Sequence, residues 1–87
     1  MISYTSADFR SHFEKLPRRV QILARKQYQL WKTNPYHPSL KFKKVGAQVW
    51  SSRINDGWRA VATPIPGGYL WFWIGSHDEY LRVIRSR

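Results

Sequence analysis

The chain has 87 residues, with 15 Lys and Arg against 5 Asp and Glu, a formal net charge of +10 and no Cys. One domain over residues 1–87 is expected at this length, and the charge predicts a polyanionic partner, either nucleic acid or an acidic protein segment. The absence of Cys excludes disulfides, the scattered His lack metal-site spacing, and no apolar run could form a signal segment or membrane span, so we expect a cytoplasmic protein without metal or other cofactor.

The N-terminal third has the periodicity of two helices. Residues 2–4 are too short for more than a stub of edge strand, and Thr5 is the expected cap of a first helix that ends at Pro17. A second helix is predicted from Pro17 to about Thr33, because one sector collects its large apolar residues: Val20, Leu23, Ala24, Leu30 and Trp31. We expect the two helices to form a hairpin that covers one face of a sheet.

A turn-rich connector over residues 34–39 leads into a basic segment. Lys41, Lys43 and Lys44 crowd four positions there, with Leu40 and Phe42 as apolar anchors. This pattern predicts a basic loop or edge segment, and its three lysines are candidate RNA-binding residues.

Three strands are predicted at residues 48–54, 58–63 and 69–75, joined by short loops that contain Asn-Asp-Gly and Pro-Gly-Gly. They form an antiparallel meander, and residues 69–74 are apolar on both faces, as in a strand near the middle of the sheet. Residues 78–86 could add a short C-terminal helix. The predicted fold class is α+β, a helical hairpin packed on a small antiparallel sheet.

The turn at residues 55–57 decides where two arginines lie. A three-residue loop with Gly57 in the left-handed region would pair Arg53 with Arg59 and Ile54 with Trp58, whereas a two-residue loop would separate the arginines onto opposite faces. Like charges placed opposite each other destabilise a sheet, unless an anion sits between them.

His77 and Tyr80 follow the last predicted strand, so the core would hold them at its edge. Guanidinium groups grip phosphate, imidazole exchanges a proton near neutral pH, and Tyr stacks or donates a hydrogen bond. With Arg53 and Arg59, this set suits RNA cleavage by its own 2′-OH. The plainer alternatives are that His77 is a turn residue and that Tyr80 fills core.

Several segments in this order resemble the RelE/ParE superfamily of type II toxins, and look closest to HigB- or RelE-like members. The segments are residues 13–17, 34–40, 50–54, 58–60 and 71–80. The resemblance implies a metal-independent mRNA endoribonuclease that acts on the ribosome and is neutralised by an acidic antitoxin. It also assigns Arg53, Arg59, His77 and Tyr80 as catalytic, and Lys41, Lys43 or Lys44 as the family's basic residues.

Two departures from that family keep alternatives open. The usual first strand is nearly missing, which predicts a mainly three-stranded sheet, and the ending after Gly75 is not Arg-rich. ParE-like relatives with this fold lack the catalytic set and inhibit DNA gyrase. A basic module that binds nucleic acid or protein without toxicity is the remaining alternative.

Overall fold

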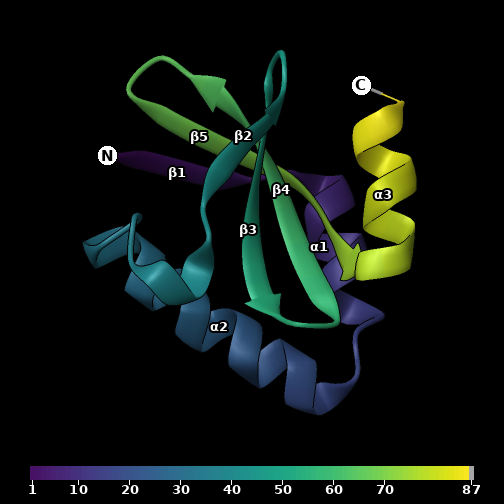
Figure 1. Ribbon diagram of the computed structural model, residues 1–87. Coiled ribbons are helices and arrows are strands. Elements are labelled where there is room, and N and C mark those ends of the chain that lie inside the picture. Colours follow the sequence, from purple (N-terminus) through teal and green to yellow (C-terminus); the bar gives the residue numbers. More distant parts are fainter. Residues whose placement is uncertain (87) are drawn as a thin grey trace.

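The computed structural model describes residues 1–86 and has an α+β fold (Figure 1). A five-stranded sheet has the strand order β1-β5-β4-β3-β2, so β4 is its central strand. In chain order the elements are β1 (Ile2–Thr5), α1 (Ala7–Glu14), α2 (Arg18–Thr33), the 3-10 helix η1 (Pro38–Leu40), β2 (Lys43–Gly46), β3 (Val49–Asn55), β4 (Trp58–Ile65), β5 (Gly68–Ser76) and α3 (His77–Arg85).

The N-terminal helices begin and end close to the predicted positions. The cap of α1 is Ser6, whose Oγ accepts a hydrogen bond from the Phe9 amide at 3.0 Å. The prediction of Thr5 as cap is wrong, because Thr5 is the last residue of β1 and pairs with Trp71. Within residues 1–86, no helix is long and apolar enough to cross a membrane.

The sheet is larger than the sequence predicted. The segment expected to be a stub forms β1, which pairs in parallel with β5 and places Ile2 opposite Gly68. The basic segment contributes β2, antiparallel to β3. The expectation of a mainly three-stranded meander is therefore wrong, whereas β5 is an interior strand between β1 and β4, near the middle of the sheet as predicted.

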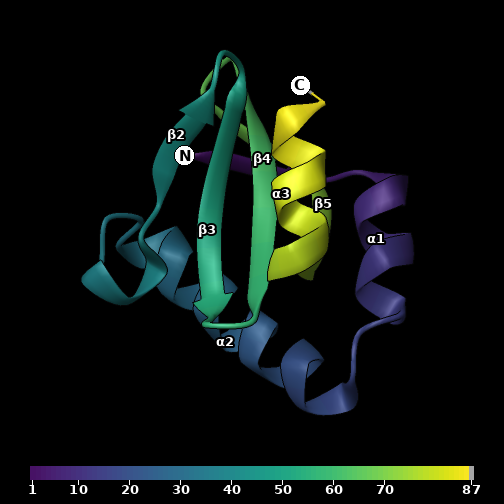
Figure 2. The ribbon, with the colours of Figure 1, turned by 45° about the vertical axis from the view of Figure 1, so that its right-hand side comes forward.

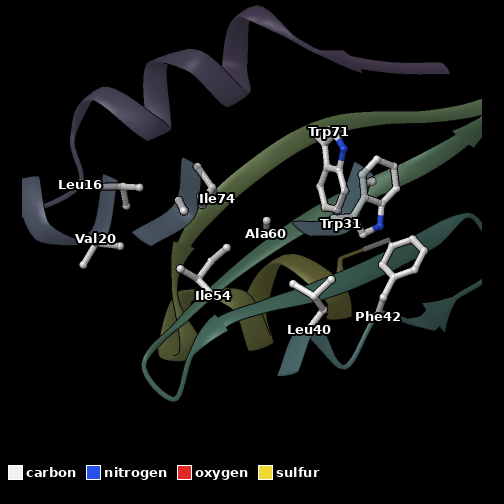
Figure 3. Close-up of a cluster of buried hydrophobic side chains, with 11 residues drawn as sticks. Leu16, Val20, Trp31, Leu40, Phe42, Ile54, Ala60, Trp71 and Ile74 are labelled. Atoms are coloured by element: carbon white, nitrogen blue, oxygen red, sulfur yellow. The ribbon is translucent and has the colours of Figure 1, made fainter. Parts of the chain in front are cut away.

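The helices cover one face of the sheet through a core rich in aromatic rings (Figure 3). Trp31 from α2 is its centre, with edge-to-face contacts to Phe42, Tyr69 and Trp71. Such contacts add to the stabilisation from apolar burial. The core fixes β4 and β5 beneath the helical layer.

The two helices diverge over the sheet and leave a cleft between them. α1 packs on β5 and α2 packs on β3, while the small Ala60 of β4 lies at the floor of the cleft. The cleft has a volume of about 420 Å³, and Arg10 and Arg25 contribute to its lining beside Phe9 and Phe13. A patch of apolar surface is thus accessible on the helical side of the molecule.

The opposite face of the sheet is only partly covered, by α3 (Figure 2). Val49, Val61 and Trp73 pack there with Tyr80 of α3. Ser76 caps α3, since its Oγ accepts a hydrogen bond from the Glu79 amide at 3.3 Å. The arginines that the sequence singled out, Arg53 and Arg59, lie on this face, beside the β3–β4 turn.

Candidate active site

Arg53 of β3 lies directly opposite Arg59 of β4, as the sequence predicted, but the turn that produces this pairing differs. Asn55 pairs with Trp58 across a two-residue loop, and a register shift between Arg53 and Asn55 inserts Ile54 as an extra residue. The extra residue restores the pairing that a three-residue loop would have given. The prediction of a left-handed Gly57 is wrong, because Gly67 is the only glycine of residues 1–86 with positive φ. The predicted Ile54–Trp58 pair is wrong as well, because Trp58 pairs with Asn55.

Both guanidinium groups donate hydrogen bonds to the β3–β4 turn, and that of Arg53 also contacts η1. Arg53 Nη2 donates to Asp56 Oδ1 at 2.6 Å, and Arg53 Nη1 donates to the Ser39 carbonyl oxygen at 3.5 Å. Arg59 Nη1 donates to the Trp58 carbonyl oxygen at 3.0 Å and to that of Asn55. The arginines are therefore positioned at one end of the sheet, next to the β3–β4 turn.

The electrostatics of the turn reflect this gathering of cations. The hydrogen bond and the charge of Arg53 lower the pKa of Asp56, and Lys41 and Arg59 act in the same direction. Burial lowers the pKa of Arg59, followed by the repulsion from Arg53, although a guanidinium stays protonated in a protein. Three of the predicted site cations thus favour the charged form of one acidic group, and Arg53 contacts it directly.

The three lysines of the basic segment do not share one face. Lys43 lies opposite Ser51 in the β2–β3 ladder, on the face that carries Arg53, whereas Lys44 lies opposite Trp50, on the helical face. Lys41 is exposed at the end of η1 with φ of 43°, a left-handed conformation that is uncommon for a residue with a side chain. Lys43 therefore shares a face with the arginines, Lys41 acts electrostatically on Asp56 at their turn, and Lys44 lies on the other face.

His77 and Tyr80 lie on adjacent turns of α3 with ring centroids 5.7 Å apart. The His77 amide donates to the Gly57 carbonyl oxygen at 2.8 Å, which ties the start of α3 to the β3–β4 turn, and the His77 residue is half-buried. Tyr80 is only 6% exposed, and its hydroxyl donates to Ser51 Oγ at 3.0 Å. His77 is thus the more accessible of the two, while Tyr80 is buried beneath α3.

Two contributors to the site were not singled out from the sequence. Asp56 was considered only as a turn residue, although an acid three positions after Arg53 was a signal for an ion pair. Ser51, which is 2% exposed, receives the Tyr80 hydroxyl, a contact that only the packing of α3 could reveal. Across residues 1–86, no three His, Cys, Asp or Glu side chains gather as a metal site.

No protein-family model and no curated protein matches this sequence. Its fold is nevertheless found in solved toxin structures. A chain of the RelB–RelE antitoxin–toxin complex from Methanococcus jannaschii has a TM-score of 0.73 at 8% identity, over 92% of this chain and 96% of that one. The YoeB/ParE toxin from Agrobacterium tumefaciens has a TM-score of 0.69 at 18% identity, over 88% of this chain and 99% of that one. A copper-bound mutant toxin from Helicobacter pylori has a TM-score of 0.63 at 16% identity, over 88% of this chain and 94% of that one. The chain therefore has the fold of RelE/ParE-type toxins.

Proposed function

We propose that this protein is the toxin of a toxin–antitoxin pair and cleaves mRNA on the ribosome without a metal ion. The observation that carries the proposal is the direct pairing of Arg53 with Arg59 at the sheet end where His77 emerges. The likeness in fold to solved RelE- and YoeB/ParE-type toxins supports the same class of function.

The proposed reaction uses the 2′-OH of the RNA as nucleophile. Its oxygen forms a bond to the adjacent phosphorus while the bond from phosphorus to the 5′ oxygen breaks, which gives a 2′,3′-cyclic phosphate and a 5′-OH. His77 takes the proton of the 2′-OH and returns one to the 5′ oxygen, because imidazole is the side chain of this set suited to proton exchange near neutral pH. Arg53 and Arg59 stabilise the negative charge that builds up on the phosphorane.

The remaining residues bind or position. Lys43, on the arginine face, and the exposed Lys41 would attract the RNA backbone. Lys44 is not included in this role because it lies on the helical face. Tyr80, predicted from the sequence as catalytic, is proposed as a positioning residue, since its hydroxyl is directed to Ser51 and its ring contacts His77.

An acidic antitoxin is the proposed protein partner, given the net charge of +10. The cleft between α1 and α2 would take apolar side chains of this partner, and Arg10 and Arg25 would attract its carboxylates. Co-purification with the product of the neighbouring reading frame tests this. Ala60→Leu, which fills the floor of the cleft, should reduce co-purification of a folded toxin. Undiminished co-purification would contradict the cleft assignment.

The proposed activity is tested with purified protein, translating ribosomes and a defined mRNA, followed by mapping of 5′ ends. The wild type should give codon-linked cuts, and His77→Ala or Arg59→Ala should reduce them by about 100-fold or more. Lys44→Ala is the matched control and should cut normally. Intact mRNA combined with inhibition of gyrase supercoiling would instead favour a ParE-like, non-enzymatic toxin.

A further inference from the structure

We propose that Asp56 is a built-in competitor for the phosphate of the RNA: its carboxylate occupies Arg53 in the free protein and must be displaced when RNA binds. The proposal rests on the proposed function only in taking a phosphodiester as the ligand of the arginine pair. It assigns to the β3–β4 turn a role in setting the affinity of the site.

The contact has the geometry of a ligand that is easily exchanged. Asp56 Oδ1 lies 2.6 Å from Arg53 Nη2, yet the Asp56 side chain is 98% exposed while that of Arg53 is 23% exposed. Arg53 also has a second, longer contact, from Nη1 to the Ser39 carbonyl oxygen at 3.5 Å, that does not involve Asp56. An exposed ion pair is weak and screened by salt, so a polyanion can displace it.

The position of Asp56 is that of a substitute anion. Arg53, Lys41 and Arg59 all favour its charged form, and all three are residues that we propose to bind RNA phosphates or to stabilise the phosphorane. The carboxylate also offsets the repulsion between the paired arginines, which would otherwise destabilise the hairpin. A phosphate oxygen placed at Arg53 would take over both roles.

The other four acidic residues of the chain lie elsewhere. Asp8 is in the first turn of α1, Glu14 is its last residue, and Asp78 and Glu79 are in the first turn of α3. Only Asp56 makes an ion pair with a basic side chain within residues 1–86. Asp56 is therefore the acidic residue whose charge bears on Arg53, and Glu14 offers a control with the same charge change at a distant surface.

The test measures binding of a single-stranded RNA decamer made of 2′-O-methyl nucleotides, which cannot be cleaved, by fluorescence anisotropy at fixed salt. Asp56→Asn should tighten binding by about 2- to 5-fold, the range expected for release of an exposed ion pair. Glu14→Gln should change binding less. In an Arg53→Ala background the gain from Asp56→Asn should fall to that of Glu14→Gln, because the competitor acts through Arg53.

Three results would overturn the competitor role: a gain no larger than that of Glu14→Gln, a gain that keeps its full size without Arg53, or weaker binding by Asp56→Asn. The last would mean that Asp56 positions Arg53 for the ligand. Thermal unfolding of each variant confirms that it is folded. RNA cleavage is measured separately. If the wild-type protein does not cleave RNA but Asp56→Asn shows the predicted gain in binding, the proposed enzymatic function is rejected and the competitor role of Asp56 still holds.

Discussion

The hydrogen bond between Tyr80 and Ser51 gives a test of whether Tyr80 supports the site or takes part in the chemistry. Tyr80→Phe removes the hydroxyl that donates to Ser51 Oγ at 3.0 Å. Ser51 is 2% exposed, so its own hydroxyl would be left buried without a partner. Such a loss costs about 1–2 kcal/mol, which corresponds to a fall in Tm of roughly 5–15 °C for a domain of this size.

The assay is urea unfolding followed by tryptophan fluorescence, which the 5 Trp residues make sensitive. Ser51→Ala in the Tyr80→Phe background should recover part of the loss, because two apolar groups need no hydrogen bond. Additive losses in this double-mutant cycle would refute the reasoning, since they would mean that the two hydroxyls do not interact.

The same variant separates support from chemistry. At matched folded fraction, Tyr80→Phe should retain RNA cleavage within about 10-fold of wild type, because proton transfer is assigned to His77. A loss as large as that of His77→Ala would show that the Tyr80 hydroxyl takes part in the reaction.

Further predictions follow from the sheet and the turn. Gly68→Ala should release β1 and speed amide exchange in residues 2–5, because its Cβ would lie 1.7 Å from a β1 carbonyl oxygen, at a cost of about 2–3 kcal/mol. Gly57→Ala, whose Cβ would meet only Asn55 Oδ1 at an ordinary contact distance of 3.8 Å, should unfold nearly as the wild type does. Lys43→Ala should weaken binding of the 2′-O-methyl decamer more than Lys44→Ala, since the neighbours lie on opposite faces; equal effects would contradict that register. Folding lowers the pKa of Asp56 from its ordinary value of 3.8. Its ion pair therefore stabilises the protein at pH values above 3.8, and this contribution is lost as the pH falls through the lower pKa of the folded state. In urea unfolding, the wild type should therefore have a higher free energy of unfolding than Asp56→Asn at pH 6, and the two should be equal at strongly acidic pH. A difference in this free energy that grows on acidification would contradict the lowered pKa of Asp56.

Helical periodicity made α2 predictable almost to the residue, because Val20, Ala24 and Trp31 recur at the spacing of one buried face. The strand β1 was not predictable in the same way. It has four residues, two half-buried and two exposed, and exists because β5 offers a parallel partner whose Gly68 admits a close approach. Pairing between two strands that lie far apart in the sequence leaves no local signal in either segment.

The candidate site shows the same division between local and distant causes. The assumed three-residue turn placed Arg53 opposite Arg59 correctly, although a bulge at Ile54 rather than a left-handed Gly57 produces this register. The separation of Lys43 from Lys44 depended on β2 being a strand, which the run of lysines concealed. The ion pair at Asp56 is a contact within the turn and was open to prediction.

The central claim is that this sheet end promotes attack by the 2′-OH, and it is tested most directly by removing that group at one position. An mRNA with a single 2′-deoxy nucleotide at the mapped cleavage site should be left intact by the wild-type protein on translating ribosomes. The matched all-ribose mRNA should yield a 2′,3′-cyclic phosphate end in a His77-dependent manner. Cleavage of the 2′-deoxy substrate at the same position would contradict the account.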